Sequence, residues 1–269
     1  MLFICIHAKK AVLLSPNLES MKGKNCLVLL MVLLLGSMLV GCGKSAALYN
    51  RAGTVVRDTL NGVPCCVYMP CAYEARTSET FPVLYLQHGM YGNENDWVAK
   101  GRLVAIMDSL LQLGEVAEMV VVMPDNCPSR PTAEEERANA TTGEWEKNFS
   151  AFMAAAERRY RISTKPSERA IAGLSMGGYH TMMVSSVLDG QFAYVGMFSP
   201  AVFVHRAPSE PAKLWLGIGK DDFLYTKVQS YRGWLEENHR EYTYYESAGG
   251  HTWDNWQDYI VRFLRELTF

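Results

Sequence analysis

A serine flanked by glycines carries the strongest chemical signal in this sequence. The segment 173–177, Gly-Leu-Ser-Met-Gly, follows a short apolar run at 170–172, and an apolar pattern with helical spacing begins at Tyr179. A strand, this segment and a helix, in that order, are typical of a sharp turn that exposes the nucleophilic hydroxyl of Ser175. The helix start directs backbone N–H groups at a developing oxyanion. An ordinary glycine-rich turn is the alternative interpretation.

A serine nucleophile needs a general base, and His251 is the predicted one. It follows the last expected strand and two glycines, which allow a loop to carry the imidazole over the serine. His88 is the competitor, but it precedes the position that usually supplies an oxyanion hole, so a role in bracing its loop suits it better. The remaining histidines lie in the N-terminal segment, an expected helix or surface-like segments (His7, His180, His205 and His239).

The acid that orients the base is expected from one of two neighbouring aspartates. A carboxylate must accept the Nδ1–H of the imidazole, and Asp221 and Asp222 both follow an expected buried strand. Either one could turn inward, and Asp222 is preferred. Asp254 lies three residues after His251 and better suits the N-cap of the last helix. Serine, aspartate and histidine in this chain order are typical of α/β-hydrolases.

Strands and helices alternate around these residues. Asn61-Gly62 predicts a hairpin turn between its two flanking strands. The expected strands lie at 54–60, 63–69, 81–87, 119–123, 170–172, 194–198, 213–218 and 242–245, and the expected helices at 103–113, 145–160, 179–188, 227–237 and 256–267. This order predicts one α/β domain over 53–269, with a mostly parallel central sheet, helices on both faces and an N-terminal antiparallel hairpin.

The chemical residues all follow expected strands, so they should meet at one edge of the sheet. The oxyanion hole is expected from the backbone N–H of Met176, next to the nucleophile, and that of Met90, in the loop after the strand at 81–87. Trp97 and the polar loop at 127–142 are candidates for the substrate pocket. As an alternative, Trp97 only braces the adjacent loop.

Composition and cysteine spacing exclude several other classes. The chain has 269 residues, of which 49% are hydrophobic and 20% charged, and its formal charge of −2 offers no basic field for nucleic acid. No C-x-x-C pair occurs, so a zinc site is not expected, and chemistry at a serine nucleophile implies no metal or organic cofactor. Adjacent Cys65 and Cys66 would point to opposite faces of a strand. Disulfide pairing among the downstream cysteines is left open (Cys65, Cys66, Cys71 and Cys127).

The first 41 residues are interpreted as a signal peptide. An apolar run at 26–40 follows Lys22 and Lys24 and is short for a membrane span. Basic residues before such a run are typical of a secretory signal, whose natural first residue here is Met21. The run ends in Leu-Val-Gly-Cys42, which resembles the lipobox of bacterial lipoproteins. That resemblance implies cleavage before Cys42, lipid on this cysteine, a tether over 42–52, and export to a lipid-anchored position in the bacterial cell envelope. A plain signal peptide or a buried apolar segment is the alternative.

Four segments resemble the putative-esterase family, which includes feruloyl and acetyl xylan esterases, the esterase D group and mycobacterial acyltransferases. They are 82–97 (Pro-Val-Leu-Tyr-Leu-Gln-His-Gly-Met-Tyr-Gly-Asn-Glu-Asn-Asp-Trp), 173–178 (Gly-Leu-Ser-Met-Gly-Gly), 219–225 (Gly-Lys-Asp-Asp-Phe-Leu-Tyr) and 249–253 (Gly-Gly-His-Thr-Trp). The resemblance implies an α/β-hydrolase fold over about 53–268, with the acid at Asp222 and the second oxyanion donor at Met90.

These observations together predict a lipid-anchored serine esterase that acts through an acyl-enzyme. The resemblance implies feruloyl or acetyl esters of polysaccharides as substrates. An acyltransferase with the same three catalytic residues is one alternative. A non-catalytic binding lipoprotein on a hydrolase scaffold is another, although the complete set of Ser175, Asp222 and His251 argues against it.

Overall fold

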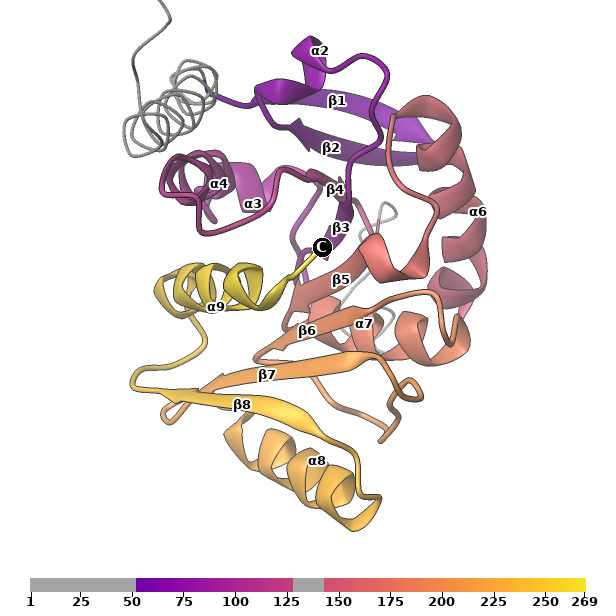
Figure 1. Ribbon diagram of the computed structural model, residues 1–269. Coiled ribbons are helices and arrows are strands. Elements are labelled where there is room, and N and C mark those ends of the chain that lie inside the picture. The colour runs from indigo at the N-terminus through magenta and orange to yellow at the C-terminus, as the bar shows by residue number, and fades with distance from the viewer. Residues whose placement is uncertain (1–51, 128–142) are drawn as a thin grey trace, which may run out of the picture. The chain divides into compact units, whose positions relative to one another are not determined.

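An eight-stranded sheet lies at the centre of the computed structural model, which describes residues 52–127 and 143–269 (Figure 1). The strands follow the spatial order β1-β2-β4-β3-β5-β6-β7-β8. The pairs β1–β2 and β2–β4 are antiparallel, and every other pair is parallel. The bounds are β1 Thr54–Leu60, β2 Val63–Met69, β3 Val83–Gln87, β4 Val120–Pro124, β5 Arg169–Leu174, β6 Tyr194–Phe198, β7 Lys213–Gly219 and β8 Tyr242–Ser247.

The N-terminal hairpin has the predicted bounds and turn. Leu60 pairs with Val63 across a two-residue loop, and Asn61 and Gly62 have φ values of 50° and 79°. Positive φ at both loop residues suits a type I′ turn, whose twist matches that of the flanking strands. The prediction from Asn-Gly is therefore confirmed.

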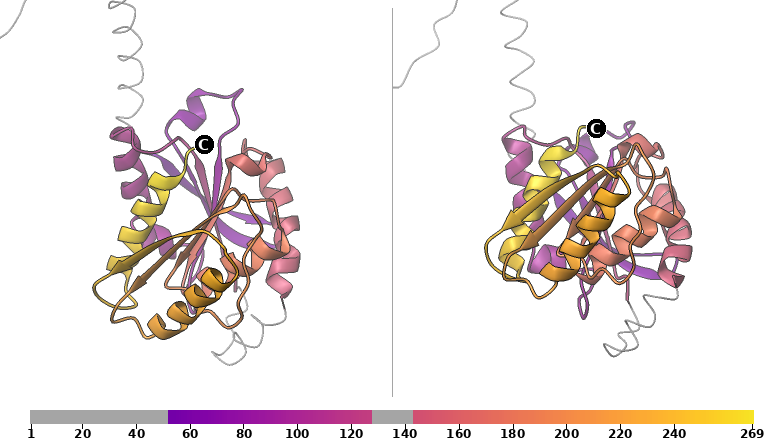
Figure 2. Two further views of the ribbon diagram at one scale, coloured as in Figure 1. Left: turned by 60° about the horizontal axis from the view of Figure 1, so that its bottom comes forward. Right: turned by 90° about the horizontal axis from the view of Figure 1, so that it is seen from below.

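Helices cover both faces of the sheet, as the alternation predicts (Figures 1 and 2). Helices α6, α7 and α8 pack on one face, where Phe149, Tyr179 and Val228 join one buried cluster. Helices α3, α4 and α9 pack on the other, where Trp97 and Phe263 join the second cluster. The bounds are α2 Ala72–Ala75, α3 Asp96–Ala99, α4 Leu103–Gln112, α6 Glu144–Arg159, η1 Pro166–Glu168, α7 Met176–Val187, α8 Tyr225–Glu237 and α9 Trp253–Glu266.

The two adjacent cysteines of β2 lie on opposite faces of the sheet, as expected from the strand period. Cys65 belongs to the cluster under α6 and α7, and Cys66 to the cluster under α4 and α9. Both thiols are buried, and burial raises the pKa of Cys65 to about 12. These side chains therefore act as small apolar core residues.

Three local features differ from the predictions or fall outside them. Helix α7 begins at Met176, three residues before the apolar pattern that marked it, because glycines carry no hydrophobic signal. No helix was predicted in the segments containing α2 and α3, because helices of four residues are too short to show a period. The predicted signal peptide at 1–41, the predicted lipidation site Cys42 and most of the loop at 127–142 lie outside the described residues. Within the described ranges no helix is long and apolar enough to cross a membrane.

Candidate active site

Ser175 sits at a strained turn between β5 and α7. Its backbone has φ 54° and ψ −117°, a conformation that residues with a side chain rarely adopt. Two hydrogen bonds tie it to the end of β6 and the segment that follows: the Ser175 N–H donates to the Phe198 carbonyl at 2.8 Å, and the Ala201 N–H donates to the Ser175 carbonyl at 2.9 Å. Gly173 allows the close approach, since a Cβ on it would lie 2.4 Å from the Gly177 carbonyl oxygen. The strand–turn–helix predicted from the sequence is therefore present.

Asp222 and His251 form a hydrogen-bonded pair beside this turn. Asp222 follows β7, and its Oδ2 accepts a hydrogen bond from His251 Nδ1 at 2.8 Å, while its Oδ1 accepts one from the Leu224 N–H at 2.9 Å. Asp222 is only 4% exposed. Burial raises the pKa of Asp222, but the hydrogen bonds from His251 and Leu224 outweigh it, so this pKa lies below its usual value. The carboxylate is thus ionised and bound to the nitrogen that an orienting acid must hold.

The other two aspartates considered for this role point elsewhere. Asp221 is exposed, and its backbone N–H donates to the Gly249 carbonyl at 3.0 Å, which helps to join the loops after β7 and β8. Asp254 is in the first turn of α9, whose N-cap is Thr252, so its predicted place at the N-cap is wrong by two residues. The choice of Asp222 over Asp221 agrees with this geometry.

Ser175 and His251 open onto one cavity of about 580 Å³. Met90 and Met176 line it too, and Met176 is the first residue of α7, whose N–H has no acceptor within its own helix. The described residues that line the cavity are Gly89, Met90, Tyr91, Gly92, Asp96, Lys100, Leu174, Ser175, Met176, Ala201, Phe203, Phe223, Leu224, Lys227, His251, Trp253 and Trp256. The ends of β3, β5, β7 and β8 therefore meet at one site, as predicted.

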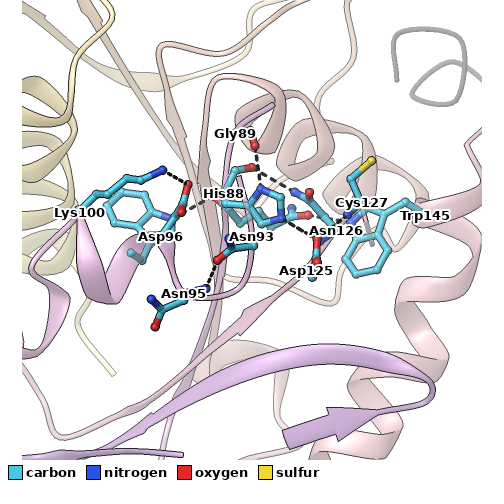
Figure 3. A network of polar contacts seen from close by, with 12 residues as sticks. His88, Gly89, Asn93, Asn95, Asp96, Lys100, Asp125, Asn126, Cys127 and Trp145 are labelled. Carbon is cyan, nitrogen blue, oxygen red and sulfur yellow. Dashed lines mark hydrogen bonds and ion pairs between the residues drawn. The ribbon is translucent and has the colours of Figure 1, made fainter. Parts of the chain in front are cut away.

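His88 is buried in a network of polar contacts where β3 and β4 end (Figure 3). It is 1% exposed; its Nδ1 donates to the Gly89 carbonyl at 2.7 Å, and its Nε2 lies 3.2 Å from Asp125 Oδ1 and from the Asn126 N–H nitrogen. The Asn126 amide also donates to the His88 carbonyl at 3.1 Å. Both ring nitrogens are engaged, so His88 braces the loop that carries Met90, and the geometry does not favour it as the base.

Trp97 braces the same region and does not line the cavity. It is 1% exposed, and its indole N–H donates to the Gln87 carbonyl at 3.0 Å. Its ring makes edge contacts with Phe198 and Trp253, at centroid distances of 6.1 and 5.3 Å. The prediction that Trp97 contacts substrate is thus contradicted, because α3 turns its side chain into the core. Of the two interpretations of this residue, the structure supports bracing.

Several lining residues were missed by the sequence analysis. Phe223 follows the predicted acid directly, and Trp253 ends the segment that contains His251, so proximity to those residues could have indicated them. Phe203 and Lys227 reach the cavity from the segment after β6 and from α8, with the Lys227 ammonium 5.1 Å from the Phe203 ring centroid. No sequence pattern marks these two, because packing across the sheet edge decides their place.

The fold and the site define an α/β-hydrolase with a serine nucleophile turn and a histidine–aspartate pair. The family model described as "Putative esterase" matches residues 61–267. This chain belongs to that family, which confirms the resemblance seen in the sequence.

Two esterases are among the curated proteins that align with the chain. An endo-1,4-beta-xylanase/feruloyl esterase of Xylanibacter ruminicola is 30% identical over 161 residues, which cover 58% of this chain and 22% of the relative. The match thus spans about a fifth of that longer protein. An acetyl esterase of Caldicellulosiruptor saccharolyticus is 24% identical over 233 residues, covering 68% of this chain and 82% of the relative.

Solved structures confirm the predicted fold. A ferulic acid esterase of Anaeromyces mucronatus in complex with ferulic acid is similar with a TM-score of 0.72 and 21% identity, over 81% of this chain and 91% of that one. An S-formylglutathione hydrolase of Staphylococcus aureus gives a TM-score of 0.64 and 17% identity, over 80% and 96% of the two chains. At these identities the likeness establishes the architecture.

Proposed function

We propose that this protein is a serine esterase that hydrolyses feruloyl or acetyl esters of polysaccharides through an acyl-enzyme. The observation that carries the proposal is the 2.8 Å contact between Asp222 and His251, with His251 lining the same cavity as Ser175. The family and the relatives named feruloyl esterase and acetyl esterase support the same reaction.

Each group has a defined part in the reaction. The Ser175 hydroxyl attacks the ester carbonyl and passes its proton to Nε2 of His251, while Asp222 holds Nδ1–H. The N–H groups of Met90 and Met176 stabilise the oxyanion of the tetrahedral intermediate. Collapse breaks the ester bond, and the leaving alcohol takes the proton from Nε2. Water then attacks the acyl-enzyme by the same route, which releases the acid and restores the serine.

The low pKa of Asp222 supports this role for the pair. Its carboxylate carries a negative charge when the imidazole gains a proton from Ser175, and the two charges then attract each other in a buried setting. The Leu224 N–H fixes the second carboxylate oxygen, so the imidazole is held in one orientation. A neutral side chain at 222 would keep neither the charge nor the tautomer.

The volume and walls of the cavity support a bulky ester. A cavity of about 580 Å³ lies within the range that encloses whole small organic molecules, so it exceeds the needs of an acetyl group alone. Aromatic walls from Phe203, Phe223 and Trp253 suit a flat phenolic acyl group or a sugar ring. The volume therefore favours feruloyl esters over acetyl esters, while the aromatic walls suit either half of such an ester.

Labelling with a fluorophosphonate probe tests the nucleophile. We expect wild type to be labelled and Ser175→Ala to lose both labelling and ester hydrolysis. Ser186→Ala is the matched control: this serine lies on α7, and its hydroxyl only donates to the Met182 carbonyl, so labelling should persist. Hydrolysis of neither feruloyl nor acetyl esters by folded wild type would refute the substrate class, and absent labelling would favour a non-catalytic binding role.

We further propose that the mature chain is anchored by lipid at Cys42. The support is the apolar run at 26–40 followed by Leu-Val-Gly-Cys, a sequence pattern outside the described residues. Several acyl chains on one residue give stable membrane attachment, whereas one does not. In a bacterial host the full chain should partition into detergent and lose that property in Cys42→Ser. Equal partitioning of both proteins into the aqueous phase would refute the anchor.

A further inference from the structure

Phe223 is a large apolar side chain left exposed beside the catalytic base. It is 76% exposed, although its neighbours Asp222 and Leu224 are buried. Its ring centroid lies 4.6 Å from that of the His251 imidazole, at an interplanar angle of 53°, and it lines the cavity. Because this exposed ring lines the cavity and packs on His251, it is placed to contact a bound molecule.

The chemistry of the proposed reaction fixes which part of the substrate lies here. Nδ1 of His251 is held by Asp222, so Nε2 is the nitrogen that returns the proton to the leaving alcohol. The alcohol oxygen must therefore come within hydrogen-bonding distance of that nitrogen. Side chains that pack on the imidazole consequently flank the alcohol half of the ester.

Two aromatic rings that line the cavity pack on this imidazole, and they differ greatly in exposure. Trp256 meets the ring edge-on, at a centroid distance of 4.8 Å and 89°, but it is 6% exposed and serves as support. Phe223 also lines the cavity and is largely exposed. The exposed ring is thus the one placed to contact the alcohol.

A second aromatic wall stands near the base. Trp253 lines the cavity and meets Trp256 edge-on at a centroid distance of 5.2 Å, and buried Trp97 at 5.3 Å. These contacts fix its indole ring before any ligand arrives. Rigid aromatic faces bind a flat partner with little loss of conformational entropy.

Charged groups that suit hydroxyls lie beside Trp253. Lys100 forms an ion pair with Asp96 at 3.0 Å, and both line the cavity. The Gln257 side chain of α9 donates to the Lys100 carbonyl at 2.8 Å, which ties this pair to the helix that carries Trp253. A sugar ring offers C–H groups on its faces and hydroxyls at its edges. The Trp253 ring suits the C–H groups, and Lys100 and Asp96 suit the hydroxyls.

We propose that Phe223 and Trp253 form an alcohol-binding subsite that holds a sugar ring of the ester. The proposal rests on the esterase function above. Phe223 determines the specificity of this subsite, because its ring contacts both the sugar and the imidazole that protonates the oxygen of the leaving sugar.

Paired esters with one acyl group and two alcohols test the subsite. The pairs are feruloyl arabinose with methyl ferulate, and acetylated xylose with methyl acetate; methanol is too small to reach the aromatic walls. In Phe223→Ala, kcat/KM for the sugar ester should fall about tenfold more than for the methyl ester, mainly through KM, as expected for one lost aromatic contact. Phe203→Ala is the matched control: this ring lines the same cavity, so both esters should change equally.

A binding measurement that needs no turnover completes the test. Xylotriose should change the tryptophan fluorescence of Ser175→Ala, and adding Phe223→Ala should weaken that binding. This readout separates failure of the subsite from failure of the esterase function. An equal loss for both esters in Phe223→Ala would mean that the ring only supports His251, and that result, or xylotriose binding unaffected by the substitution, would overturn the proposal.

Discussion

Gly177 lies directly against the carbonyl oxygen of His88. A Cβ built on Gly177 would stand 2.3 Å from that oxygen, far inside van der Waals contact. The first turn of α7 is thereby held against the end of β3. The two proposed oxyanion donors, Met176 and Met90, belong to these two segments, so this contact sets the spacing between them.

Substitution of this glycine should therefore damage catalysis. In Gly177→Ala the added methyl group pushes α7 away from the loop after β3, and we expect kcat to fall about 100-fold, as for a displacement of about 1 Å in a reacting site. Overpacking should also lower the free energy of unfolding by about 1–3 kcal/mol. Ester hydrolysis and urea unfolding measure the two effects.

Gly233 provides the matched control for that variant. It lies in α8, and a Cβ on it would meet nothing within 4 Å. Gly233→Ala should keep full activity and gain about 0.5–1 kcal/mol of stability from its higher helix propensity. Equal kcat values for Gly177→Ala and wild type would show that the contact with His88 does not position the donors.

Asp222 and Asp221 should respond very differently to the same change. Asp222→Asn keeps the size of the side chain but removes the charge and favours the wrong tautomer of His251, so kcat should fall about 10⁴-fold. Asp221→Asn changes an exposed side chain and should alter kcat by less than about twofold. Steady-state kinetics on one ester compares them; a larger loss in Asp221→Asn would reverse the assignment of the acid.

Acid should weaken the fold through Asp222. A carboxyl group whose pKa is lower in the folded than in the unfolded chain stabilises the fold above its unfolded value, about 3.9, and loses that effect as pH falls through the folded value. The stability difference between wild type and Asp222→Asn should therefore shrink from pH 5 to pH 2. Urea unfolding across this range measures it, and a difference that grew on acidification would contradict the lowered pKa.

His88 and His251 can be separated by their effects on labelling. His251→Ala should abolish fluorophosphonate labelling, because Ser175 then lacks its base. His88→Ala leaves that base in place but removes the ring between Gly89 and Asp125, so labelling should slow by about 10–1,000-fold without vanishing. Complete loss of labelling in His88→Ala, with folding intact by circular dichroism, would support His88 as the base.

The candidate catalytic residues could be predicted from the sequence because local patterns mark them. Ser175 lies between a strand and a helix with glycines on both sides, and Asp222 and His251 each follow a strand, so topology alone brings them to one edge. The hairpin turn was equally visible, since Asn61 and Gly62 accept positive φ.

Positions set by packing between distant segments could not be predicted in this way. Trp97 looked like a pocket residue because its neighbours belong to the loop after β3, but a hydrogen bond to Gln87 and contact with Trp253 draw it into the core. Phe203 and Lys227 reach the cavity from segments with no chemical signal. Such placements depend on the three-dimensional path of the chain.

The strand that leads to the base is the outermost on its side of the sheet. Strand β8 pairs with β7 alone and is only partly buried, whereas β5, which leads to Ser175, pairs on both sides and is buried throughout. Edge segments open at lower free energy than central ones. We expect the amide hydrogens of β8 to exchange with solvent faster than those of β5. Mild denaturant should therefore abolish ester hydrolysis while the turn that carries Ser175 is still folded.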